Sequence, residues 1–485
     1  MKTMGIAIAA LCLNVAVCMA QESVGPSAVI QPTKMRLSEP LRDLVRPLPA
    51  FDPELGWREN PNHPRRFTDD RASRPPSLDP VRQTDQGPRP AGPIIINWGG
   101  LSIHENVLEL APADPSLAVG VNDDLVQMVN AVFYVADKNN NWKIPPSLNS
   151  DLWIGFGGAC EFNNDGDPMV LYDSLADRWL MSQHVFSTTQ CIAISQTSDP
   201  TGSYFLYAYA TPGNDNPRFG VWSDGYYVGM RNLDSGEYDV YAFERDKMLL
   251  GDPGAQAVSF SLETLLPGAD NFLPADIDGT TAPPAGAPAV FLGMENPSIL
   301  QSHLVTFEVS VDWDNAVNST LSGPTSLLVA QFDGNLCNFS FDCIGQKNTP
   351  QRVDALSGTM MHPVAYRNFG THASIVANHT VDLGDFPDHA GVRWYEFRNV
   401  GSGWSVHQQG TYGPDTDHRW NGSIAMNGAG DIMLGYTVSS NITVPTIRYV
   451  GRLAGDPLGE MTLAEGTMIE SIAGQVGSNR WGDFS

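Results

Sequence analysis

Side chains that can bind or transform polar ligands recur where short apolar runs of the sequence begin and end. One set starts such runs: Asp114, Asp167, Arg218, His362, Arg419, Trp420, Arg480 and Trp481. A second set ends the runs that follow: Asn130, His184, Arg231, Glu295, Asn378 and His379. In a hairpin, the start of the first strand and the end of the second lie at the same edge. We therefore expect both sets on one face of the molecule.

This mixture of Arg, Asp, His and Trp suits a sugar or another polyhydroxylated ligand. Aromatic faces stack on sugar rings, whereas Arg, Asp and Asn form hydrogen bonds with hydroxyls or carboxylates. The predicted ligand-binding residues are Asp114, Asp167, Arg218, Arg231, His362, His379, Arg419, Trp420 and Trp481.

Catalysis at the same face is an alternative, with His362, His379 and Arg419 as candidate residues. In a polysaccharide lyase, Arg would neutralise a uronate carboxylate and one of the two histidines would act as base. In a glycoside hydrolase, two carboxylates would act as a pair. The candidate carboxylates are Asp114, Asp167 and Glu396. An architectural role is also open, because such side chains can tie neighbouring sheets together.

The elements that must position these residues are short strands. Runs such as "LVQMVNAVFYVA", "YFLYAYA" and "HLVTFEVSV" alternate or are rich in β-branched and aromatic residues, and Gly, Asn, Asp and Pro separate them. In "RWYEFR", alternation places Arg393, Tyr395 and Phe397 on one face of an interior strand. Glu396 and Arg398 share the other face, as an expected ion pair between sheets.

One hairpin pattern restarts along the chain, at Asp114, Asp167, Asn216, Leu273, His362 and Trp420. The spacings are 53, 49, 57, 89 and 58 residues, and a four-stranded repeat of this length is typical of a β-propeller. "RWGDFS", residues 480–485, parallels "HRWNGS", residues 418–423, and reads as the opening strand of a further repeat. We predict an all-β, seven-bladed β-propeller whose last blade is incomplete at the C-terminus. A β-sandwich is the alternative, but it has no reason to restart one hairpin so regularly.

The chain divides into three predicted regions. Residues 1–20 read as a signal peptide, cleaved after Ala20, so we expect a secreted or cell-surface protein. Residues 21–93, rich in Pro and Arg, are predicted to be a flexible tail or linker. Residues 94–485 form the propeller, with an insertion at about 310–355.

Cysteines and charge limit the partners. Four cysteines remain after the signal peptide, and nearest pairing predicts the disulfides Cys160–Cys191 and Cys337–Cys343. The formal net charge of −26 argues against nucleic acid, and no apolar run is long enough for membrane insertion.

A metal site has weak support. The oxygen-rich turn "NNDGDP", residues 163–168, could hold calcium through Asp165 and Asp167, but it lacks the spacing of a twelve-residue calcium loop. The alternative is a plain Asn/Asp/Gly turn. No other cofactor is indicated.

Several segments together resemble a widespread family of exported bacterial β-propeller proteins. They include "FGVWSDGYYV", "LPADIDGTTAPPAGAP", "YRNFGTHASIVANHTVD", "QQGTYGPDTDHRWNGSIAM" and "RWGDFS", and the resemblance covers about residues 114–485. It implies the propeller fold and export. The family is largely uncharacterised and distantly similar to sialidase-type propellers, but the sialidase Asp-box pattern is not intact here. In that family, further strands follow the "RWGDYS" strand and complete the blade.

These observations predict an exported propeller that binds an extracellular ligand, with a glycan as the favoured partner. One alternative is a carbohydrate-active enzyme, a glycoside hydrolase or a polysaccharide lyase, that uses the rim of the central channel. The other is a protein-interaction scaffold that binds a surface protein, with the insertion at about 310–355 as the contact.

Overall fold

A computed structural model describes residues 22–46, 48, 58–59, 78–101, 110–296, 300–385 and 387–481. The described chain is dominated by β-strands, and most of them belong to six four-stranded antiparallel units, numbered 1 to 6 here in chain order. Unit 1 contains β7 (Ser116–Val119), β8 (Asp124–Val129), β9 (Val132–Asp137) and β10 (Trp142–Leu148). Unit 2 contains β11 (Met169–Asp173), β12 (Arg178–Val185), β13 (Thr189–Ser195) and β14 (Tyr204–Ala210).

The other four units follow the same order. Unit 3 contains β15 (Asn214–Val221), β16 (Gly225–Asn232), β17 (Tyr238–Glu244) and β18 (Ala257–Ser261). Unit 4 contains β19 (Asp270–Ile277), β20 (Ala289–Met294), β21 (Leu300–Ser310) and β22 (Thr320–Asp333). Unit 5 contains β25 (Met360–Asn368), β26 (Ala373–Asp382), β27 (Ala390–Asn399) and β28 (Trp404–Tyr412). Unit 6 contains β29 (His418–Met426), β30 (Ile432–Ser440), β31 (Thr443–Arg452) and β32 (Gly466–Glu470).

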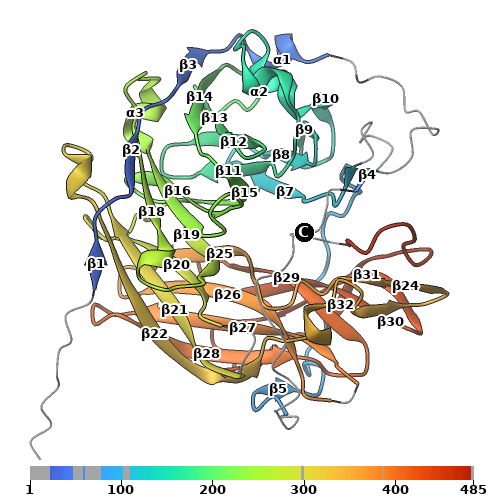
Figure 1. Cartoon of the computed structure of the whole chain (residues 1–485). Coiled ribbons are helices and arrows are strands. Elements are labelled where there is room, and N and C mark those ends of the chain that lie inside the picture. Colours follow the sequence, from blue (N-terminus) through green and yellow to red (C-terminus); the bar gives the residue numbers. More distant parts are fainter. Residues whose placement is uncertain are drawn as a thin grey trace, which may run out of the picture.

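The units have a propeller-like arrangement (Figure 1). The first strands β7, β11, β15, β19, β25 and β29 pack against one another in chain order. β19 and β25 also pair in parallel, which joins units 4 and 5 into one ten-stranded sheet. The predicted all-β, propeller-like architecture is confirmed, without the number of seven blades. The seventh blade stays a prediction, because Arg480 and Trp481 are in no strand and residues 482–485 lie outside the described part.

Apolar side chains from facing sheets fill the space between neighbouring units. Strand β27 shows how alternation achieves this. Tyr395 and Phe397 belong to the core shared with unit 4, whereas Trp394 belongs to the core shared with unit 6. The interior strand predicted from "RWYEFR" is therefore confirmed. Glu396 and Arg398 do form an ion pair, at 2.6 Å, but both lie on β27 and so within one unit.

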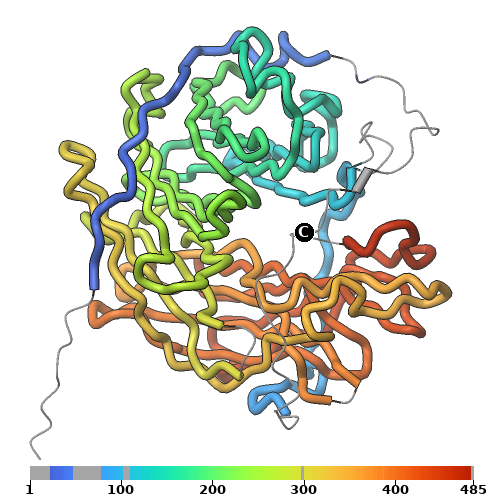
Figure 2. Tube along the Cα trace, viewed as in Figure 1, coloured from blue at the N-terminus to red at the C-terminus, as the bar shows by residue number. Residues whose placement is uncertain are grey.

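The N-terminal segment follows the outer edges of three units (Figure 2). β1 (Ser23–Val24), β2 (Ala28–Ile30) and β3 (Lys34–Leu37) pair antiparallel with β22, β18 and β14, and α1 (Leu41–Leu44) follows. These residues were expected to be part of a flexible tail. The difference has a physical cause: an edge strand offers unpaired backbone groups, so a partner can add with few buried side chains. Leu41 is the exception, with no exposed surface.

Residues 78–101 also lie against the units. β5 (Arg82–Gln83) pairs in parallel with the outer strand β28 of unit 5, and Arg89 forms a bridge with Leu463, between β31 and β32 of unit 6. β4 (Arg58–Glu59) pairs with β6 (Leu110–Ala111). Of the predicted linker, the described parts are therefore docked along the outside of the sheets.

The remaining elements connect the units. They are α2 (Ala159–Phe162), α3 (Arg245–Leu250), the 3-10 helices η2 (Asn149–Trp153), η3 (Leu262–Thr264), η4 (Ala316–Asn318) and η5 (Cys337–Phe339), and the hairpin β23 (Ile344–Gln346) and β24 (Thr349–Val353). The predicted insertion at about 310–355 thus holds this hairpin, but β22 within it is the fourth strand of unit 4.

Both predicted disulfides, Cys160–Cys191 and Cys337–Cys343, are present. The first ties α2 to β13, and the second closes the turn that precedes β23. Disulfides form and persist in oxidising compartments, which fits an extracellular protein. Among the described residues, no helix has the length and apolar character needed to cross a membrane.

Candidate functional site

The first strands begin at one face of the molecule, named the start face here, and a repeated backbone feature marks it. Asp114, Asp167, Asn216 and Asn421 all have positive φ angles, between 41° and 51°. Asn and Asp tolerate this left-handed conformation better than other side chains. Backbone groups freed by the turn bind to the preceding unit: Asn130 Oδ1 accepts a hydrogen bond from the Asp167 backbone N–H (2.7 Å), and Asp167 Oδ2 accepts one from Asn216 (3.1 Å). The predicted rim residues of units 1 to 3 therefore do come together.

Charges at this part of the start face are matched within the protein. Asp167 Oδ2 lies 3.6 Å from His184 Nδ1. Burial alone would raise the pKa of Asp167, but the nearby His184 and Arg218 hold it below its usual range. Arg231 forms an ion pair with Asp270, and Arg218 has only 2% of its surface exposed. These side chains face protein partners, and the ligand role predicted for Asp167, Arg218 and Arg231 stays a prediction.

Of the two histidines proposed as bases, His379 is buried and His362 is half-buried. His379 has no exposed surface, and its Nε2 lies 2.9 Å from the Tyr395 hydroxyl. Burial lowers the pKa of His379 to about 3 and that of His362 to about 4. His362 Nε2 lies 3.1 Å from the Phe219 carbonyl oxygen, to which it can only donate. Both rings are therefore neutral at pH 7, and their catalytic role stays a prediction.

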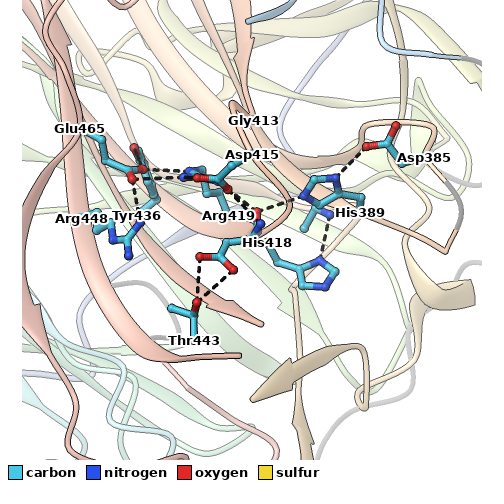
Figure 3. Close-up of polar contacts among 12 residues, drawn as sticks. Asp385, His389, Gly413, Asp415, His418, Arg419, Tyr436, Thr443, Arg448 and Glu465 are labelled. Atoms are coloured by element: carbon cyan, nitrogen blue, oxygen red, sulfur yellow. Dashed lines mark hydrogen bonds and ion pairs between the residues drawn. The ribbon is translucent and has the colours of Figure 1, made fainter. Parts of the chain in front are cut away.

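Arg419 is the centre of a charged network in unit 6 (Figure 3). Its buried guanidinium donates to Asp415 (2.7 and 2.9 Å) and to Glu465 (2.9 and 3.1 Å). Glu465 also accepts hydrogen bonds from the Tyr436 hydroxyl (2.7 Å) and from Arg448 (2.8 Å). Burial would raise the pKa of Glu465, but Arg419 and its other donors keep it lowered. All of the hydrogen bonds that Arg419 donates in this network go to residues within or next to unit 6.

A histidine pair lies beside this network and was not predicted from the sequence (Figure 3). His389 Nδ1 lies 2.8 Å from Asp385 Oδ2, and its Nε2 lies 3.0 Å from the Asp417 carbonyl oxygen. The His418 ring is nearly perpendicular to it, at 5.4 Å between centroids. His418 Nδ1 accepts a hydrogen bond from the Ala390 N–H (3.2 Å), and burial lowers the pKa of His418 to about 4. The i, i+4 spacing of Asp385 and His389 within a loop is no recognisable motif.

The two predicted tryptophans of the start face pack in the protein. Trp420 is fully buried in a cluster with Leu336 and Ile344, and Trp481 packs against that cluster. The Asn421 side chain donates to the Trp481 carbonyl oxygen (3.1 Å). A cavity of about 330 Å³ opens nearby, and its polar lining residues are Arg352, Asp388, His418 and Asn441.

The opposite face, named the turn face here, is where each first strand turns into the second. A groove of about 320 Å³ lies there between units 4 and 5. Three aromatic side chains line it: Trp222 after β15, Tyr366 near the end of β25, and Trp404 at the start of β28. Ring centroids of Trp222 and Tyr366 are 4.7 Å apart, and those of Tyr366 and Trp404 are 6.1 Å apart, both edge to face. Trp404 is the partly exposed member.

The Pro- and Gly-rich stretch between β19 and β20 forms one wall of this groove through Pro284, Ala287 and Pro288. Trp222 donates its indole N–H to the Ala287 carbonyl oxygen (2.9 Å), which fixes both the ring and the wall. The sequence marks this wall as an insertion inside a hairpin turn. The sequence does not indicate which aromatic residues, distant along the chain, lie beside this wall.

Polar groups complete the groove, which is named the aromatic groove below. Glu308 on β21 and His372 before β26 both line it. Burial raises the pKa of Glu308 and lowers that of His372, so both shifts favour the neutral form. Asn368 and Asn399 also line the groove, and each accepts a hydrogen bond within its own turn. Sequence analysis did not predict this site.

Two carboxyl groups lie at the end of β19 on the same face. Asp276 accepts a hydrogen bond from the Val221 N–H (2.7 Å). Burial, together with the charge of Asp278, raises the pKa of Asp276 to about 8. Burial raises that of Asp278 to about 6, against the opposing charge of Arg367. The turn face therefore holds acids that take up protons near neutral pH, and it also holds a buried ion pair between Asp173 and Arg245.

No group of three or more His, Cys, Asp or Glu side chains in the described residues is arranged to hold a metal ion. In "NNDGDP", Asp165 Oδ2 instead accepts a hydrogen bond from the Phe186 N–H (3.0 Å). Calcium at Asp165 and Asp167 stays a prediction.

Comparison with known proteins finds distant structural likeness only. No protein-family model and no curated protein matches the chain. A protein of unknown function from Dyadobacter fermentans is 11% identical, over 73% of this chain and 68% of that chain, with a TM-score of 0.23. The catalytic domain of a GH62 α-L-arabinofuranosidase from Coprinopsis cinerea is 9% identical, over 62% and 88%, with a TM-score of 0.28. A GH43 endo-arabinanase from Bacillus licheniformis is 9% identical, over 59% and 92%, with a TM-score of 0.26.

Likeness at this level gives no support for a shared activity. The resemblance to an exported bacterial family stays a prediction.

Proposed function

We propose that this chain is an exported glycan-binding protein whose ligand occupies the aromatic groove. The observation that carries the proposal is the groove of about 320 Å³ with Trp222, Tyr366 and Trp404 in its walls. Volumes of this order suit a small ligand, and aromatic faces are the surfaces on which sugar rings stack. Export rests on the predicted signal peptide and agrees with the two disulfides.

Each group in the aromatic groove has a role in this proposal. Trp404, the partly exposed ring, stacks on the ligand, while Trp222 and Tyr366 hold its position from beneath. Glu308 and the hydroxyl of Thr371 form hydrogen bonds with sugar hydroxyls. Because these groups come from separate turns of three units, folding fixes the site before ligand arrives, and little ordering cost remains for binding.

Binding is favoured over hydrolysis on chemical grounds. Glycoside hydrolysis generally uses two carboxyl groups that flank the scissile bond. Among the described residues that line the aromatic groove, Glu308 is the only carboxylate. A protein-interaction scaffold would instead use the segment around β23 and β24.

A glycan array followed by calorimetry tests the proposal, with Trp404→Ala as the diagnostic variant. We expect at least tenfold weaker binding with only a small decrease in melting temperature. Trp142→Ala is the matched control, because Trp142 is 55% exposed on the outer strand of unit 1, away from the groove. The absence of any glycan ligand, combined with capture of a protein partner through residues 334–355, would overturn the proposal.

A further inference from the structure

The charge of the aromatic groove limits the kinds of ligand that it can bind. The described residues that line it include one carboxylate, Glu308, and no lysine or arginine. His372 is the only other titratable lining group apart from Tyr366, and burial with the charge of Arg398 lowers its pKa, which favours its neutral form. The wall therefore presents hydrogen-bonding groups without a cation.

An anionic sugar would be poorly matched by this lining. A uronate or sulfate group that enters the groove loses hydration, and an unpaired buried charge costs several kcal/mol or is not buried at all. Charge-assisted hydrogen bonds from Arg are the usual compensation for a carboxylate. Ionised Glu308 would add repulsion instead, and a protein of formal net charge −26 also disfavours the approach of polyanions.

The cations near units 4 and 5 are already engaged. Arg367 donates through Nε to the Met426 carbonyl oxygen (3.0 Å), and Arg398 pairs with Glu396 at 2.6 Å. Arg393 is fully buried and pairs with Asp79. Moving any of these to a ligand would leave its present partner without compensation.

We propose that the aromatic groove takes uncharged glycans and discriminates against uronate-containing and sulfated ones, with Glu308 as the residue that sets this selectivity. The inference rests on the proposed function and names the ligand class for the same site. It predicts that selectivity can be reversed by one change of charge. Glu308→Lys places a cation in the groove, whereas Glu308→Gln removes the charge at nearly constant shape.

The test measures binding of the full chain to two sets of tetrasaccharides at physiological salt. Neutral probes come from glucan, galactan, mannan and arabinan; anionic probes come from polygalacturonate, alginate and glucuronan. We expect at least one neutral probe to bind at least tenfold more tightly than any anionic one. The Glu308→Lys variant should bind an anionic probe at least tenfold more tightly than wild type. For Glu308→Gln, the increase in the logarithm of this affinity should be less than half of the increase for Glu308→Lys.

Thr371→Arg provides a second route, because Thr371 is exposed in a turn and its replacement does not disturb a core. It should also admit an anionic probe, even if Glu308→Lys fails to fold. Binding of uronates by wild type as tightly as any neutral probe would overturn the inference while leaving glycan binding intact. If wild type bound neither the neutral nor the anionic probes, the proposed function itself would be overturned.

Discussion

The start face and the aromatic groove use polar residues in opposite ways. At the start face, charges are buried and paired: Arg419 has no exposed surface and contacts both Asp415 and Glu465. At the turn face, the aromatic groove leaves Trp404 partly exposed beside Glu308, whose pKa burial raises. A high density of charged residues therefore does not indicate the position of the site proposed here.

The difference has a simple physical origin. At the start face, first strands from neighbouring units converge, so their polar groups must be satisfied by one another because water has little access. At the turn face, the stretch between β19 and β20 and the turns between β25 and β26 and between β27 and β28 line a groove. Buried charge pairs fix how the units meet. A groove whose aromatic surface is not fully covered by the protein remains available for a ligand.

Removal of one partner from a buried pair should give the largest effect. The Asp79 carboxylate accepts hydrogen bonds from Arg393 (2.6 Å) and from the Thr411 hydroxyl (2.8 Å), and both charged side chains are fully buried. Asp79→Ala leaves the Arg393 cation uncompensated, and we expect a loss of about 3–5 kcal/mol in the free energy of unfolding. Denaturant unfolding monitored by tryptophan fluorescence measures it.

The matched control is Asp199→Asn, which removes the charge that pairs with Arg42, where the two side chains are 51% and 50% exposed, and keeps an amide oxygen that can accept the hydrogen bonds from Thr201. It should cost at most about 1 kcal/mol. Equal effects for Asp79 and Asp199 would mean that residues 78–101 do not dock as described.

The network around Arg419 should make stability fall on the acid side. The pKa of Glu465 is lowered in the folded state, so its contribution is present above the unfolded value, near 4.5, and is lost as pH falls through the folded value. Glu465→Gln should cost about 2 kcal/mol at pH 7 and weaken the dependence of the melting temperature on pH below 4.5. A variant as pH-dependent there as wild type would contradict this account.

On the turn face, Trp404→Ala should change function more than stability. We expect a loss of at least tenfold in glycan affinity, about 1.4 kcal/mol, because one stacking surface is removed. The unfolding midpoint should shift by less than in any start-face variant. A large stability loss with unchanged affinity would place Trp404 in the core and not in the site.

Asp276 should change the pH dependence of stability, with the sign opposite to that of Glu465. Its folded pKa, about 8, lies above the ordinary value, so the folded state binds an extra proton between pH 4 and 8. Stability should therefore decrease as pH rises through this range. Asp276→Asn should flatten that slope, as measured by melting temperatures from pH 4 to 9, while Asp246→Asn, an exposed acid on α3, should leave it unchanged.

Local patterns in the sequence determined much of the architecture. Alternation in β27 sorted its side chains correctly between two cores, and cysteine spacing gave both disulfides. The hairpin restarts at Asp114, Asp167 and Asn216 coincide with left-handed residues that begin successive units. These features are readable because strand period, turn chemistry and short-range pairing depend on residues close together in the chain.

Only the tertiary structure decided where residues 22–46 dock and where the groove lies. Strands β1 to β3 add to sheet edges through backbone groups, which carry no side-chain signature. The aromatic groove joins Trp222 to Trp404, which are 182 positions apart, through turns of three different units. The pairing of Arg419 with Glu465 and that of Arg393 with Asp79 were equally hidden, because an ion pair between distant residues depends on how sheets meet and not on any local pattern.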